Sequence, residues 1–89
     1  MNGHDAEILA LRALGWAAEA EGVLSRFTAR SGLKTDDLRR QAGDPELLAA
    51  VLDFVLAEDS LARAFCEQEG VDARQLHLAR ALLPGGESL

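Results

Sequence analysis

The chain has 89 residues and a formal net charge of −6, which is the size of one small domain. Leu and Ala each occur 16 times, whereas Val, Ile and Thr together number seven and Tyr is absent. Because strands are rich in β-branched and aromatic residues, this composition argues against a sheet fold, and the 48% hydrophobic share excludes wholesale disorder. We expect one all-α domain over residues 1–89, a compact bundle of about six short helices with mobile ends near 1–5 and 85–89.

The first predicted helix runs from near Ala6 to about Ala20, with Asp5 placed to cap its free N–H groups. Gly15 lies inside this helix, where a Gly costs about 1 kcal/mol relative to Ala. We therefore expect another helix to approach closely beside Trp16, the only Trp of the chain, which we place in the core.

Two short helices are predicted next. One runs from Val23 to about Arg30 and should end at Gly32, because Gly readily takes the left-handed conformation that closes a helix. The other begins at the N-cap Thr35 and continues to about Ala42.

The pair Asp44-Pro45 is the strongest helix boundary in the chain, since a capping carboxylate precedes a Pro at the first helical position. The helix that it opens continues to about Ala57 and is apolar on nearly every side, so we expect it at the centre of the fold. Its one small or polar stripe holds Ala49 or Ala50, Asp53 and Ala57, and we expect Asp53 to point to water.

Two further helices complete the prediction. A single helix as far as Glu69 would be about 37 Å long, too long for a domain with a radius of gyration of about 12 Å, so we expect a break with Asp59 as the next N-cap. The fifth helix should stop at Gly70. Asp72 and Gln75 form a capping-box pattern that opens a sixth helix, which should end at residues 84–86.

A shift of 38 residues superposes Phe27 on Phe65 and Gly32 on Gly70. Both copies place a Phe near the end of a helix that a Gly closes. The weak repeat predicts two helical hairpins around the central helix, and it carries no chemistry of its own.

The segment 22–43 is basic, with a net charge of +3, and its turn at Gly32 resembles that of a DNA-binding helix-turn-helix. However, the recognition helix would begin with Asp36 and Asp37, which repel phosphate, and the whole chain is acidic. We therefore keep nucleic-acid binding as the alternative function only. The basic side chains either balance acidic neighbours or face a ligand.

Catalytic and metal-binding patterns are weaker still. Cys66 and His77 belong to no recognisable nucleophile–base motif, and with His4 they give no paired spacing for zinc. We expect no enzyme activity and no cofactor. One cysteine and an acidic start favour a cytoplasmic protein, and the apolar stretches 8–20 and 47–57 are too short to span a membrane.

The sequence thus favours a non-catalytic protein-interaction or regulatory module with an unknown protein partner. The candidate partner surface combines the stripe of the central helix with the basic segment. Its residues are Ala49, Asp53, Ala57, Arg26, Arg30, Arg39 and Arg40.

The chain also resembles a family of small uncharacterised proteins of alphaproteobacteria, a domain of unknown function, over about residues 10–83. The resemblance rests on the segments Ala13-Leu14-Gly15-Trp16, Arg26-Phe27, Gly32-Leu33, Asp37-Leu38-Arg39, Asp44-Pro45, Ala50-Val51-Leu52-Asp53-Phe54 and on Gly70. It implies a compact helical protein and supplies no activity, cofactor or site.

Overall fold

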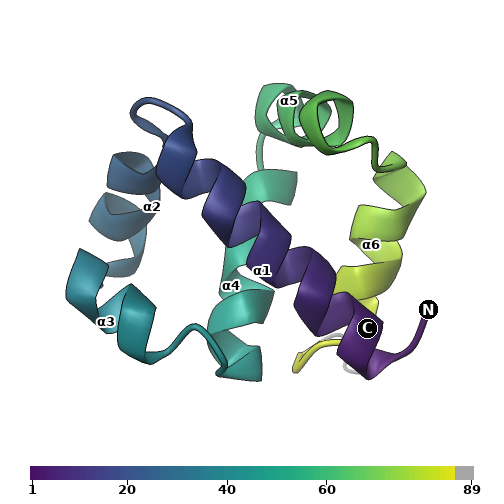
Figure 1. Ribbon diagram of the computed structural model, residues 1–89, viewed down its shortest axis with the longest axis horizontal. Helices are drawn as coiled ribbons and strands as arrows, with labels where there is room; N and C mark the ends of the chain where they lie inside the picture. Colours follow the sequence, from purple (N-terminus) through teal and green to yellow (C-terminus); the bar gives the residue numbers. More distant parts are fainter. Residues whose placement is uncertain (86–89) are drawn as a thin grey trace.

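The computed structural model describes residues 1–85 and forms a bundle of six helices with a radius of gyration of 11.9 Å (Figure 1). The helices are α1 (Gly3–Glu19), α2 (Val23–Ser31), α3 (Thr35–Arg40), α4 (Pro45–Leu56), α5 (Asp59–Glu69) and α6 (Ala73–Ala81). No strand occurs within the described residues, and the predicted all-α class is confirmed.

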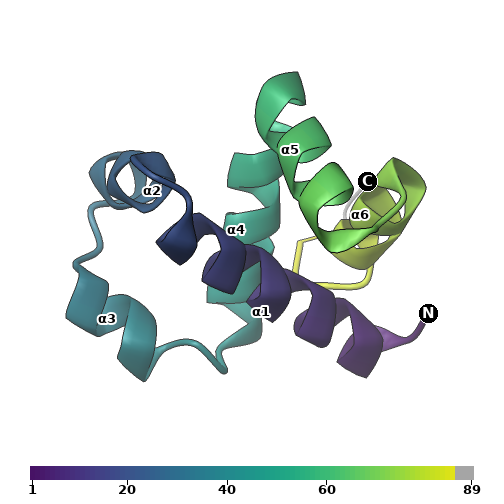
Figure 2. The same cartoon turned by 45° about the horizontal axis from the view of Figure 1, so that its top comes forward.

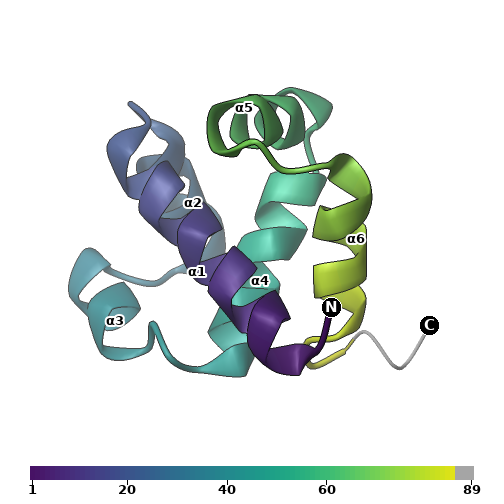
Figure 3. The same cartoon turned by 45° about the vertical axis from the view of Figure 1, so that its right-hand side comes forward.

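Helix α4 occupies the centre of the bundle. Figure 1 shows α1 crossing in front of α4, with α2 and α3 on one side and α5 and α6 on the other, and Figure 3 shows the same division. Most side chains of α4 are buried: Leu47, Leu48, Ala49, Val51, Leu52, Phe54 and Val55. The continuous apolar run of this helix therefore predicted its central position correctly.

The start of α4 is the predicted cap. A carboxylate oxygen of Asp44 accepts a hydrogen bond of 2.9 Å from the backbone N–H of Glu46, and Pro45 occupies the first turn. Proline loses nothing at this position because its missing N–H would have no partner in the helix.

Two glycines end helices as the repeat predicted. Gly32 after α2 and Gly70 after α5 have φ angles of 76° and 66°, in the left-handed region. The matching Phe of each copy is buried and meets another aromatic ring edge to face: Phe27 with Phe54 at 5.3 Å, and Phe65 with Trp16 at 5.6 Å. The repeat is thus a structural unit made of a helix stop and an aromatic pair.

The first helix begins earlier than predicted. Its N-cap is Asn2, whose side chain accepts from the N–H of Asp5 at 2.8 Å, while Asp5 accepts from the N–H of Asn2. Asn caps a helix as well as Asp does, and this reciprocal pair orders residues 3–5, which we had expected to be mobile. At the other end, the expected mobile segment 85–89 lies outside the described residues except for Gly85.

Other helix starts differ by one residue. Helix α3 has Lys34 rather than Thr35 as its N-cap, because Asp37 accepts from the N–H of Lys34 at 3.1 Å. It also ends at Arg40, two residues short of Ala42. Helix α5 has Glu58 as its N-cap in place of the predicted Asp59, which is instead its first residue.

Gly15 overturns one packing prediction. It is exposed on α1, and a Cβ added to it would meet no atom within 4 Å. The close approach expected there does not occur within residues 1–85, because Gly15 lies on the side of α1 opposite the core.

Candidate functional site

An apolar hollow of about 400 Å³ opens between α1, α2, α3 and the turn that follows α3. Its lining residues are Leu14, Ala18, Leu24, Thr35, Leu38, Arg39 and Ala42. We call this hollow the α1–α3 groove. Only Thr35 and Arg39 bring polar side chains to it, so its surface suits an apolar ligand group.

The groove exists because α3 is short and packs loosely. Helix α3 buries only Leu38, and it packs extensively against no other helix. Figure 2 places α3 at the edge of the molecule, linked to the rest by extended connections. Six residues cannot cover the flank of a helix as long as α1, so Leu14 and Ala18 of α1 border open space.

The outer face of α1 extends this apolar surface. Ile8 and Leu11 are 47% and 48% exposed, and Ile8 also borders a hollow that it shares with Gly70, Val71 and Gln75. Ile8, Leu11, Gly15 and Ala18 follow one another at intervals of three or four residues, so they form a single row along the helix. We call it the α1 row. It is about 15 Å long at 1.5 Å per residue and ends in the groove at Ala18.

Arg39 is the only charged residue that lines the groove. The other seven arginines are already engaged within the described chain, six with carboxylates and Arg30 with an aromatic ring. The ion pairs are Arg12–Glu69, Arg26–Glu58, Arg40–Asp37, Arg63–Asp59, Arg74–Asp72 and Arg80–Asp53. Arg39 has no hydrogen bond, ion pair or ring contact with residues 1–85, and its charge therefore faces solvent beside an apolar surface.

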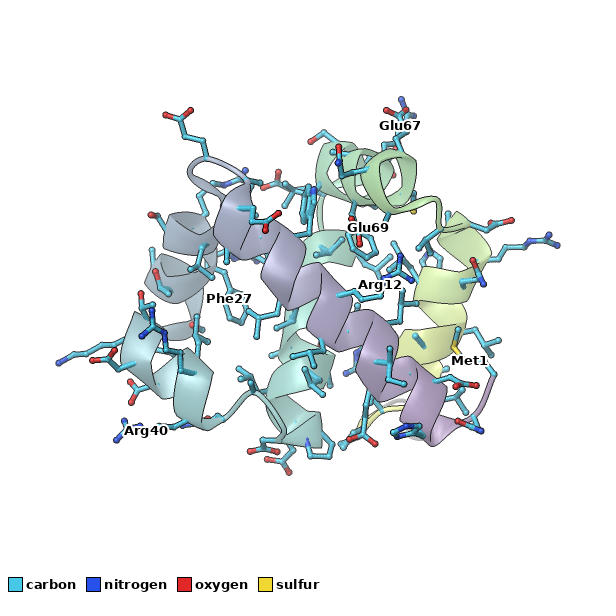
Figure 4. All side chains as sticks on the ribbon, in the orientation of Figure 1. Met1, Arg12, Phe27, Arg40, Glu67 and Glu69 are labelled. Carbon is cyan, nitrogen blue, oxygen red and sulfur yellow. The ribbon has the colours of Figure 1, made fainter. Side chains whose placement is uncertain are left out.

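Figure 4 shows two of the paired arginines. Arg12 turns from α1 toward Glu69 at the end of α5, and Arg40 lies at the outer edge of α3. Arg12 donates to the backbone oxygen of Glu69 at 3.0 Å and also lies 3.4 Å from its carboxylate. Arg40 instead pairs with Asp37 of its own helix. Arg40, which belongs to the basic segment, therefore balances an acidic neighbour, one of the two roles expected for the cations of that segment.

The predicted partner surface is only partly present. Ala49 is 4% exposed and belongs to the core, so its assignment to the solvent stripe is wrong, while the neighbouring Ala50 is half-buried. Asp53 and Ala57 are exposed as expected. The rotation of α4 against α1 decides which of two adjacent alanines is buried, and the local sequence pattern does not contain that information.

The structure brings Arg30 and Asp53 together at a smaller hollow of about 210 Å³. The guanidinium carbon of Arg30 lies 5.8 Å from the centre of the Phe54 ring, within the range of a cation–π contact. Asp53 is bound by Arg80 through two hydrogen bonds. Because both charged groups already have partners, this hollow offers less to a ligand than the groove at Arg39.

Sequence reasoning missed the α1 row. The sequence pattern predicts only one apolar arc on this helix, which includes Leu9, Ala13, Trp16 and Ala20. Ile8 and Leu11 form a second set of apolar residues on the opposite side of the helix. Their positions in the sequence could have indicated this surface, because a helix that is apolar on both faces needs two partners.

The single thiol, Cys66, lies half-buried against the core. Burial raises its pKa, and the nearby charge of Asp72 raises that pKa further. The thiol is therefore protonated and weakly nucleophilic at neutral pH. Within residues 1–85 no helix has the length and apolar character to cross a membrane, and no three potential metal ligands lie together.

The comparisons with known proteins give a family and no activity. The sequence model of the family described as "Protein of unknown function (DUF3572)" matches residues 3–86, nearly the whole chain, so the chain belongs to this family. Neither the curated proteins nor the solved structures include a significant match.

Proposed function

We propose that this member of a family of unknown function is a non-catalytic protein-interaction module, which binds an amphipathic helix of a partner protein along the α1 row and in the α1–α3 groove. One observation carries the proposal: two large apolar side chains, Ile8 and Leu11, are about half exposed on the row that leads into the apolar α1–α3 groove. Contiguous exposed apolar surface of this kind marks interaction sites on soluble domains.

The length of the surface favours a helix over a small molecule. The α1 row and the groove together extend for about 15 Å along α1, about ten residues of a second helix laid against it. A compact ligand in the groove would leave Ile8 and Leu11 in water, whereas an apolar helix face covers both. Gly15, with open space where a Cβ would be, lets the partner backbone come close at the middle of the row.

The raised pKa of Cys66 supports the non-catalytic part of the proposal, because the chain's one thiol is a poor nucleophile. Its single cysteine also keeps the cytoplasm as the expected location. We therefore place the unknown protein partner in the cytoplasm as well, where a free thiol stays reduced.

DNA binding through α2 and α3 remains the alternative, with less support. The first turn of α3 carries Asp36 and Asp37, and most arginines of the described chain are neutralised by carboxylates. Titration of labelled duplex DNA at low and moderate salt tests it, since phosphate contacts give strongly salt-dependent affinity. Binding at low salt that fades as salt rises would favour this alternative.

The proposed function can be tested with a helical peptide of about 15 alanine-rich residues that carries leucines at every third or fourth position. Added to the isotope-labelled chain, it should shift the backbone amide NMR signals of α1 and α3 and leave those of α5 unchanged. Leu11→Asp should abolish these shifts, because a carboxylate in the centre of the α1 row would be buried by the peptide.

Leu78→Asp is the matched control. Leu78 is a leucine of α6 with 47% exposure, almost equal to that of Leu11, and it lies outside the groove. The control should bind the peptide like the unmodified chain. Failure of the unmodified chain to bind, or loss of binding in the Leu78 variant alone, would contradict the proposed site.

A further inference from the structure

We infer that the partner helix carries a carboxylate on the flank of its apolar face and that Arg39 binds it, so the groove selects acidic amphipathic helices. The inference rests on the proposed function and adds the chemistry of the partner. It follows from the position of Arg39 at the groove and from the absence of an ion-pair partner for its guanidinium within residues 1–85.

The charge of Arg39 is uncompensated within the described part of the chain. Asp37, two residues before Arg39 on α3, is occupied by Arg40 and by the backbone N–H of Lys34. Asp36 lies one turn before Arg39 and forms no ion pair with it. A cation at the rim of an apolar groove attracts an anion, and a guanidinium binds a carboxylate through two parallel hydrogen bonds.

The place of Arg39 in the groove defines where the partner's carboxylate must be. Leu14 and Leu38 are 8% and 3% exposed and form the floor, while Arg39 follows Leu38 in sequence and is exposed at the rim. A partner helix that packs its apolar row on the floor presents its flanking positions to the rim. A Glu three or four residues from a core leucine of the partner would therefore meet Arg39.

Acidic residues of α1 do not cancel this preference at the groove. Glu19 follows Gly15 by four residues but lines a separate hollow, with Trp16, Ala20, Gln68 and Glu69. Asp5 lies near the start of α1, in a hollow that also includes Ile8 and Arg12, at the end of the α1 row that is remote from the groove. Neither carboxylate lines the groove. Arg39 also borders a second hollow with Lys34, Arg40, Asp36 and Asp37, where three cations stand against two carboxylates, so the local charge around Arg39 is still positive.

The test compares three peptides that differ at one flanking position, which is Glu, Gln or Lys, on the leucine-containing helix described above. At low ionic strength the chain should bind the Glu peptide about three- to fivefold more tightly than the Gln peptide, the factor expected for one partly exposed ion pair. The Lys peptide should bind most weakly, and added salt should reduce the differences.

Arg39→Gln should bring the affinities for the Glu and Gln peptides together, and Arg39→Glu should reverse the order of the Glu and Lys peptides. Neither change should disturb the fold, since Arg39 is exposed and has no hydrogen bond, ion pair or ring contact within the described chain. Arg63→Gln is the control: it changes the net charge equally, on the exposed surface of α5, and should retain the preference for Glu.

Equal affinity of the unmodified chain for the Glu and Lys peptides would overturn the inference and leave the proposed function intact. A preference for Glu that persists in Arg39→Gln would also overturn it, because another cation would then be responsible. If no peptide binds at all, the proposed function fails, and the inference fails with it.

Discussion

Arg80 of α6 binds both carboxylate oxygens of Asp53 of α4, with Nε 2.6 Å from Oδ1 and Nη2 3.1 Å from Oδ2. The same guanidinium donates from Nη1 to the backbone oxygen of Pro84 at 2.9 Å. One arginine thus links the central helix, the last helix and the segment after it. The Arg80 side chain is 21% exposed, while that of Asp53 is 59% exposed, so water weakens the pair.

Asp53→Asn should therefore lower the free energy of unfolding by no more than about 1 kcal/mol, as measured by urea denaturation. Asp59→Asn is the control, because Asp59 is 93% exposed and lies 3.6 Å from Arg63. That change should leave the urea midpoint nearly unaltered. A loss in the Asp53 variant no larger than in the control would show that the Arg80–Asp53 pair does not contribute to the free energy of unfolding.

Substitution of three glycines by alanine should change the stability of the chain in opposite directions. Gly32→Ala and Gly70→Ala should each reduce stability by about 1 kcal/mol, because both residues have positive φ angles that a Cβ disfavours. Gly15→Ala should increase stability by about 0.5 to 1 kcal/mol, since Gly15 is an exposed helical residue with free space around it. Thermal and urea unfolding of the three variants gives the signs directly. A stabilising change at Gly32 or Gly70 would contradict the left-handed helix stops.

Leu52→Ala tests the central role of α4. Leu52 is fully buried, so its truncation should cost about 2 to 5 kcal/mol, a large part of the stability of so small a domain. Leu82→Ala makes the same chemical change at a residue that is 41% exposed and should cost less than about 1 kcal/mol. Similar losses in the two variants would mean that α4 is not the core of the bundle.

Asp37 should make the stability of α3 depend on acid pH. The hydrogen bond from the Lys34 backbone, then the side chain of Arg40, hold the pKa of Asp37 below its ordinary value. A carboxyl whose pKa is lower in the folded state stabilises the fold above its unfolded pKa, about 3.9, and loses this contribution as pH falls through the folded value.

The difference in unfolding free energy between the unmodified chain and Asp37→Asn should therefore be constant above about pH 5 and should shrink at lower pH. Denaturant unfolding at a series of pH values measures it. A difference that grows on acidification would have the wrong sign for this interaction.

The features that sequence reasoning predicted are those that local chemistry determines. Asp44 and Pro45 specify a helix start, Gly32 and Gly70 specify helix stops, and Asp72 with Gln75 forms the predicted capping box at α6. Helix starts at Lys34 and Glu58 were misplaced by one residue because several acceptors compete at each turn. The start of α1 differs from the prediction because Asn2, which lies in the segment expected to be mobile, provides the cap.

The features that were not predictable depend on tertiary packing. Adjacent helix positions differ by about 100° in direction, so only the seating of α4 determines that Ala49 is buried and Ala50 is not. The groove collects Leu14, Leu24 and Leu38 from three helices, and only Arg39 among its lining residues belonged to the predicted surface. Which arginines are neutralised also depends on pairs as distant as Arg12 and Glu69.

Leu38 is the one side chain that helix α3 buries in the described part of the bundle. A helix that buries a single side chain opens locally at low free-energy cost. The amide protons of α3 should therefore exchange with solvent well before those of α4. Helix α3 can also shift its position to fit partner side chains of different sizes. Discrimination among partners would then come from electric charge at Arg39, while the dimensions of the bound helix would matter little.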